Sequence, residues 1–200
     1  MQTNQLSFCV ANPSKQGNNR TSIISQDAKA MHFLSDRGKL SFAHRIDWCL
    51  SSDANQASAD AIFVRQGMFD RSAVFESCKG HHLMTMHQLL GASNIITWRS
   101  RTHRWVLSVS SAITSQLKLL LVEDNSGQEL AYVEGPGRFQ LSSSDEYRIV
   151  INGSQQDLKD LLWVRVIIAS GLVAAKQQRK RLGQPAPHKI YDVGDVAWEE

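Results

Sequence analysis

Short apolar segments separated by turn-forming residues dominate the second half of the sequence. From residue 105 to residue 154 five of them follow one another: WVLSVSS, QLKLLLVED, QELAYVEG, RFQLSS and EYRIVINGS. Turn sequences lie between them, notably DNSG at 124–127 and GPG at 135–137. Segments of this length, spaced at roughly 8–12 residues, are typical of antiparallel β-sandwiches and barrels. The sequence therefore predicts a mainly β protein.

The first half of the sequence contains further segments of the same kind. LSFCV (6–10), KLSFAHRID (39–47), ADAIFVRQG (59–67) and SAVFESC (72–78) resemble strands of a half-buried sheet. The stretch 81–90 differs, because Leu83, Met86, His87 and Leu90 recur at helical spacing before a glycine suited to a helix cap. We expect a short helix over 81–90.

Two structures compete for DLLWVRVIIASG (160–171). As a strand, it would place Leu162, Val164, Val166 and Ile168 on one face, whereas as a helix it would be apolar nearly all round. The β-branched content favours the strand. The following residues, LVAAKQQRKRLG (172–183), are rich in alanine and end in basic residues and glycine, which predicts a helix.

Together these segments predict an antiparallel β-sandwich of short strands from about residue 5 to residue 170, with one internal helix and a closing C-terminal helix. Residues 1–183 are expected to form a single domain, and 184–200 a C-terminal arm. The alternative is an α+β fold in which one long helix over 155–182 replaces the last strand.

Composition narrows the class of protein. With 42% apolar and 20% charged residues, the chain resembles a globular domain, and its net charge of +3 implies no polyanionic partner by itself. Three widely spaced cysteines and the lack of a secretory signal predict free thiols and a cytoplasmic location, or a virion if the chain belongs to a viral or phage particle. The apolar run 161–175 is short and contains Arg165, so no membrane association is expected.

The densest group of basic and aromatic side chains is TWRSRTHRW (97–105). As a hairpin it would bury its tryptophans and expose a charged tip, and this is the favoured interpretation. As one continuous strand it would offer a phosphate-tracking, base-stacking face, provided that the basic helix end lies on the same side. That nucleic-acid-binding alternative would use Trp98, Arg99, Arg101, His103, Arg104, Trp105, Arg179, Lys180 and Arg181.

The terminal arm combines acidic and apolar residues after two prolines. Its side chains Tyr191, Val193, Val196 and Trp198 are candidates for docking on a partner. The arm could also fold back over the basic helix end through opposite charge.

The third candidate site surrounds Cys78. With His82 and Met86 it would form a soft-metal set on a helix, and with His81 or His82 a thiol nucleophile with its base. Gly80 opposes such a helix, and the spacing matches no zinc pattern, so neither a metal nor a cofactor is expected.

The sequence contains no complete catalytic or nucleotide-binding motif. We therefore predict a non-enzymatic protein-protein interaction or assembly subunit, that is, a structural or adaptor component of a larger complex. Its partner would be another protein or a further copy of the chain, bound through sheet edges and the arm. The nucleic-acid-binding module is the alternative, and a thiol enzyme or metal site at Cys78 remains as a residual hypothesis.

Overall fold

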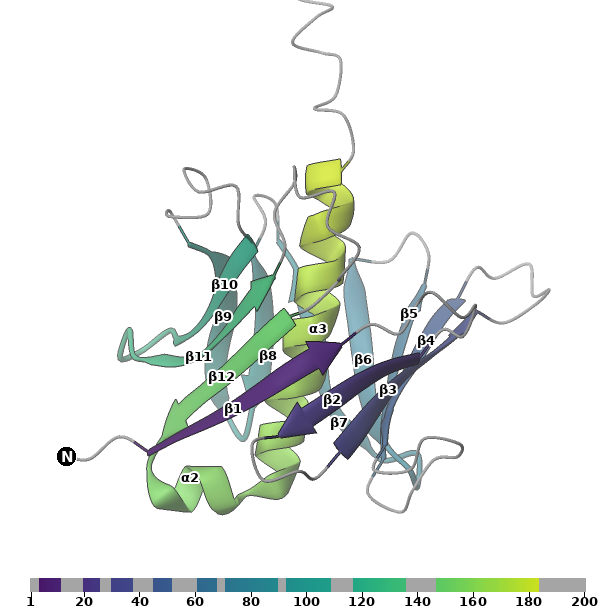
Figure 1. The fold of residues 1–200 in the computed structure, drawn as a ribbon. Coiled ribbons are helices and arrows are strands. Elements are labelled where there is room, and N and C mark those ends of the chain that lie inside the picture. Colours follow the sequence, from purple (N-terminus) through teal and green to yellow (C-terminus); the bar gives the residue numbers. More distant parts are fainter. Residues whose placement is uncertain are drawn as a thin grey trace, which may run out of the picture.

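The computed structural model describes residues 4–11, 20–25, 30–37, 45–51, 61–67, 71–89, 93–108, 117–135 and 147–183. These residues form twelve strands and two helices (Figure 1). The strands are β1 (Asn4–Ala11), β2 (Arg20–Ser25), β3 (Ala30–Arg37), β4 (Arg45–Ser51), β5 (Ile62–Gly67), β6 (Ser72–Ser77), β7 (His82–Gln88), β8 (Asn94–Trp98), β9 (Arg101–Leu107), β10 (Leu117–Glu123), β11 (Glu129–Gly135) and β12 (Tyr147–Gly153). The helices are α2 (Gln155–Lys159) and α3 (Leu161–Gly183).

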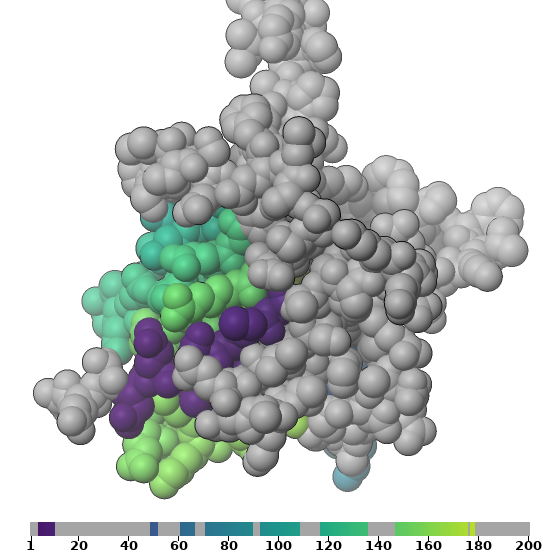
Figure 2. All heavy atoms as spheres, viewed as in Figure 1, coloured from purple at the N-terminus to yellow at the C-terminus, as the bar shows by residue number. Residues whose placement is uncertain are grey.

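The strands form one closed antiparallel barrel. Each strand from β2 to β12 pairs with its neighbours in sequence, and β1 pairs with both β2 and β12, which closes the sheet. Figure 2 shows β1 lying alongside β12 on the front of the molecule, with α2 beneath them. The predicted mainly antiparallel β fold is confirmed. A single closed sheet takes the place of the two packed sheets of the predicted sandwich, because the first strand pairs with the last, with Asn4 opposite Gly153.

Helix α3 lies inside the barrel, surrounded by strands (Figure 1). Residues 166–170 and 172–175 are at most 2% exposed and Gly171 is buried, so the helix is covered on every side. The strand predicted for 161–169 is therefore wrong, and the alternative of a long C-terminal helix is correct apart from a break at Asp160. A helix that is apolar all round must be enclosed on all sides, and here the barrel encloses it.

The inner wall follows the two-residue alternation of a strand. In β10, Leu117, Leu119 and Leu121 are buried and the residues between them are half-buried, and β5, β6, β9 and β11 alternate in the same way. The inward side chains and α3 form one hydrophobic core. The strands predicted around 62–67, 72–77, 117–123, 129–135 and 147–153 are all present, whereas RFQLSS lies outside the described residues.

The helix expected over 81–90 is wrong, because this stretch contains strand β7. Met84 and Met86 point into the barrel and are each 1% exposed, while Thr85 between them is half-buried. Leu83, Met86, His87 and Leu90 fit a helical spacing, whereas Met84 and Met86 fit the two-residue alternation of a strand. Pairing with β6 and β8 decides between the two.

The part of the chain described by the structure contains no helix with the length and hydropathy needed to cross a membrane. The terminal arm, 184–200, lies outside the described residues, so its role stays a prediction.

The helix approaches the barrel wall closely at Gly171. A Cβ atom there would lie 2.9 Å from Cγ2 of Val133 and 3.0 Å from the ring of Trp105, and both of these side chains are fully buried. We expect Gly171→Val to lower the free energy of unfolding by about 2–3 kcal/mol, because a packed core resists added volume. Urea denaturation measures the change. The control is Leu161→Ala in the same helix, where the leucine is 68% exposed, and it should change stability by less than about 0.5 kcal/mol. Equal stability of Gly171→Val and the native chain would contradict the close packing.

Candidate binding site at one end of the barrel

The basic segment TWRSRTHRW is a hairpin whose turn is only two residues long. Trp98 pairs with Arg101, and Arg99 and Ser100 between them have φ values of +46° and +66°. Positive φ at both central residues matches the twist of paired strands. The hairpin interpretation is confirmed, and only Arg99 and Ser100 form the turn.

Both tryptophans of this hairpin pack against α3. Trp105 is fully buried, and its Nε1 donates a hydrogen bond of 3.1 Å to Oγ of Ser170 on the helix. Trp98 stacks on Trp163, with ring centroids 5.5 Å apart and an angle of 17° between the planes. These rings anchor the hairpin to the helix and are not displayed for stacking on bases.

The arginines of the hairpin pair with carboxylates of neighbouring elements. Arg99 lies 2.7 Å from Asp160, at the break between α2 and α3. Arg101 lies 3.5 Å from Glu123 on β10, and Arg104 lies 3.0 Å from Asp124 in the following turn. The sequence analysis did not identify these acidic partners, because they lie 20 or more residues away.

Local capping fixes the acidic side of the site. Ser154 starts α2 with a capping box in which its hydroxyl accepts from the backbone N–H of Asp157, while Oδ2 of Asp157 accepts from the Ser154 backbone N–H at 3.1 Å. Asp160 starts α3, since its Oδ1 accepts from the backbone N–H of Trp163 at 3.2 Å. Both carboxylates therefore stabilise helix starts as well as forming part of the site.

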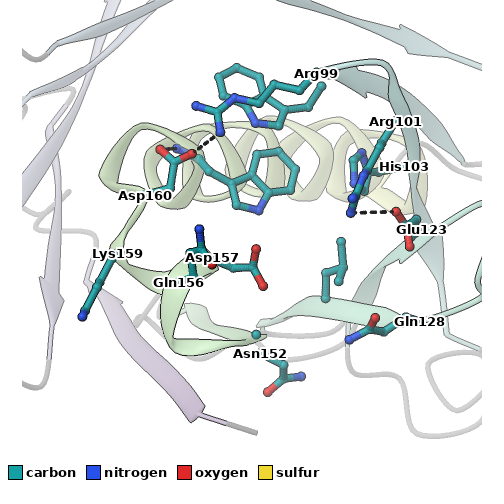
Figure 3. A pocket seen from close by; sticks show the side chains of 14 residues that line it. Arg99, Arg101, His103, Glu123, Gln128, Asn152, Gln156, Asp157, Lys159 and Asp160 are labelled. Carbon is teal, nitrogen blue, oxygen red and sulfur yellow. Dashed lines mark hydrogen bonds and ion pairs between the residues drawn. The ribbon is translucent and has the colours of Figure 1, made fainter.

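These elements surround a cavity of about 630 Å³ at the end of the barrel where α3 begins, which we call the barrel-end hollow (Figure 3). A volume of this size lies in the range of small-molecule and peptide pockets. Figure 3 shows the side chains of both helices, the hairpin and β10 gathered around it. The lining residues are Trp98, Arg99, Arg101, His103, Glu123, Gln128, Leu130, Asn152, Gly153, Gln156, Asp157, Lys159, Asp160 and Trp163.

His103 is the one buried titratable side chain among the lining residues. It is 3% exposed, its ring lies 5.1 Å from that of Trp163, and its Nδ1 atom has no hydrogen-bond partner. Burial lowers the pKa of His103, and the negative charge of Glu123 partly offsets this effect. The imidazole therefore lies in the wall of the hollow, with its unpartnered Nδ1 atom covered by neighbouring atoms.

The second basic segment lies far from the hairpin. The backbone of Arg179 to Arg181 belongs to the last turns of α3, about 24 Å along the helix axis from Trp163 at roughly 1.5 Å per residue. The side chains of Arg179, Lys180 and Arg181 are outside the description. The hairpin packs at the start of α3 and the second basic segment belongs to its other end, so the nucleic-acid-binding alternative stays a prediction.

The residues around Cys78 do not come together as a soft-metal set. Cys78 lies in the turn between β6 and β7, Met86 points into the core, and Nε2 of His82 lies 3.0 Å from Oγ1 of Thr85. In the described ranges, no group of three or more histidine, cysteine, aspartate or glutamate residues is placed to hold a metal ion. The helical spacing that aligned Cys78, His82 and Met86 disappears in a strand.

No protein-family model matches this chain, and neither does a curated protein or a solved structure. Its function is therefore argued from the site itself.

The buried neutral His103 predicts a pH effect on stability. Because its pKa is lower in the folded chain than the ordinary value of 6.5, the unfolded chain binds more protons as the pH falls below that value. The contribution of His103 to stability is complete above about pH 6.5 and is lost on acidification. We expect the urea midpoint to fall more steeply between neutral and mildly acidic pH in the native chain than in His103→Asn. Parallel pH profiles would contradict this assignment.

Proposed function

We propose that the chain is a non-enzymatic protein-interaction module that binds an acidic segment of a partner protein at the barrel-end hollow. The observation that carries the proposal is the pair of exposed arginines at its rim. The side chains of Arg99 and Arg101 are 67% and 73% exposed, although each has an ion-pair partner. A guanidinium has five N–H donors, so one carboxylate contact leaves most of them available to a ligand.

The carboxylates of the hollow use more of their hydrogen-bonding capacity within the protein than the two arginines do. Asp157 accepts from both the hydroxyl and the backbone N–H of Ser154. Asp160 forms an ion pair with Arg99 and accepts a hydrogen bond from the backbone N–H of Trp163, and Glu123 forms an ion pair with Arg101 and accepts from the hydroxyl of Ser126. Hydrogen-bond donors are therefore what this site has in excess, and the amides of Gln128 and Gln156 add to them. A carboxylate group of a ligand matches this excess.

An acidic protein segment fits better than a nucleic acid. Three carboxylates line the hollow, from Glu123, Asp157 and Asp160, and a continuous phosphate backbone would meet all of them. An acidic peptide can place one carboxylate beside the arginines and neutral residues elsewhere. The buried Trp98 and Trp105 are also withdrawn from base stacking, which single-strand binding uses.

The groups around the hollow support a binding role over catalysis. Its described lining residues include no cysteine, serine or threonine, and its carboxylates, which can also act as nucleophiles, are engaged in ion pairs or hydrogen bonds. Among the described strands, each has a partner on both sides, so docking through a free sheet edge receives no support. Docking through the arm residues Tyr191, Val193, Val196 and Trp198 stays a prediction, as does assembly into a larger complex.

Binding of defined peptides to the full chain tests the proposal. We expect some fluorescein-labelled peptides of alternating glutamate with serine, leucine or tryptophan to bind, and their glutamine counterparts not to bind, by fluorescence anisotropy. Replacing Arg99 and Arg101 together by glutamine should weaken binding at least about tenfold, since hydrogen bonds to charged groups each contribute about 1.5–3 kcal/mol.

The matched control is Arg65→Gln on β5. It removes the same charge and breaks an ion pair of 2.9 Å with Glu76, but it lies outside the lining of the hollow. This control should bind like the native chain. An oligothymidine that binds in preference to every acidic peptide, and loses binding in the double variant, would favour the nucleic-acid alternative. Failure of all acidic peptides to bind would overturn the proposal.

A further inference from the structure

The free Nδ1 atom of His103 is the feature of the hollow that the arginines do not explain. Polar atoms buried in a protein almost always have a hydrogen-bond partner, and an exception calls for a physical reason. Nδ1 is buried and has no partner within the described part of the chain. The imidazole packs against Trp163, at 5.1 Å between ring centroids, and is also hydrogen-bonded to the backbone of Arg101.

Charged groups face His103 from several elements. Arg101 lies two residues away on β9 and disfavours a proton on the ring, while Glu123 on β10 and Asp124 in the next turn favour one. At the rim, Arg99 and Asp160 form an ion pair with each other. From α3 the group packed on the ring is Trp163, which is uncharged. In the free protein, burial outweighs the acidic neighbours and the ring stays neutral.

A carboxylate entering the hollow would change this balance. It would bring a negative charge close to the ring, and an opposite charge at short range favours the protonated imidazole. Arg101 and His103 are two residues apart on β9, so their side chains leave the strand on the same face. Figure 3 shows both on one wall of the hollow, with Glu123 next to Arg101. A carboxylate held by Arg101 therefore lies close to the ring of His103.

We propose that the exposed Arg101 receives the partner's carboxylate, and that the neighbouring His103, buried in the wall of the hollow, takes up one proton from solvent when the partner binds. This inference rests on the proposed function, because it assigns the group that the acidic segment presents to the hollow. In the complex, the guanidinium of Arg101 donates to the carboxylate, and the negative charge of the carboxylate stabilises the imidazolium of His103 at short range. The site thus binds its partner more tightly at mildly acidic pH than at neutral pH.

Linkage between proton and ligand binding sets the size of the effect. Uptake of one proton raises the association constant by at most tenfold for each unit of pH lost, in the interval between the pKa of His103 in the free and in the bound protein. The carboxylates of the peptide stay ionised above about pH 5.5, since glutamate titrates near 4.3. Between pH 7.5 and 6 we therefore expect the affinity of the full chain for the acidic peptide to rise several-fold.

The test measures the same anisotropy titrations at pH 7.5 and pH 6 for the native chain, His103→Asn and the Arg65→Gln control. The native chain and the control should show the several-fold rise, and His103→Asn should bind with an affinity that does not change with pH. Isothermal titration calorimetry in buffers of different ionisation enthalpy should show uptake of a proton by the native chain at neutral to mildly acidic pH. This second measurement needs no variant, so it tests proton uptake on binding even if His103→Asn does not fold.

The outcomes separate the two proposals. Binding of the acidic peptide with the same affinity at both pH values and without proton uptake would overturn the role of His103 and leave the interaction module in place. A pH dependence that persists unchanged in a folded His103→Asn would overturn it as well. Absence of acidic-peptide binding by the native chain at either pH would overturn the proposed function and this inference together.

Discussion

The structure depends on one mutual requirement between the barrel and its central helix. A closed barrel of twelve strands encloses more space than the inward side chains of its strands can fill, so a further element must occupy the interior. Helix α3 is apolar on every side and would expose a large hydrophobic surface anywhere else. Each element thus buries the surface that the other cannot bury alone.

The position of the helix is set by contacts that leave little freedom. Gly171 lets the backbone approach Val133 and Trp105. The indole of Trp105 donates to Ser170, whose hydroxyl lies 3.2 Å from the carbonyl oxygen of Ile167. A buried polar pair surrounded by apolar side chains is costly to separate, so it also specifies the register of helix and wall.

The candidate site follows from where this helix begins. Trp163, in its first turn, receives the rings of Trp98 and His103, and Asp160, just before it, pairs with Arg99. The hairpin is therefore docked on the helix start, and its arginines are held at the rim of the hollow. A charged turn that could have been an ordinary solvated loop becomes one wall of a site because its aromatic residues belong to the core.

Local sequence patterns predict some of the strands and the packing of the hairpin. The alternation of Leu117, Leu119 and Leu121 predicts an inward-facing strand, and the two tryptophans of the hairpin predict a buried pair around a charged tip. The same reasoning fails for 161–169, because β-branched residues favour a strand only when a sheet is available to receive them, and here the sheet is already closed around the helix.

The site itself could be recognised only in part. Its arginines and His103 stand out in the sequence, but Asp160 and Trp163 are about 60 residues further along, and no local pattern connects them with the hairpin. Closure of the barrel was equally hidden, since the pairing of β1 with β12 depends on contacts across almost the whole described chain. Both features arise from long-range packing, which periodicity does not encode.

The most direct test of this account is hydrogen exchange of the backbone amides in the full chain, measured by mass spectrometry with peptide-level resolution. If α3 is the centre of the barrel, its amides between Val164 and Ala175 exchange only when the whole protein unfolds, as slowly as those of β10 and β12. Exchange in this part of the helix that is clearly faster than in the surrounding strands would show that the helix leaves the barrel without unfolding it, and would contradict the mutual dependence of the two.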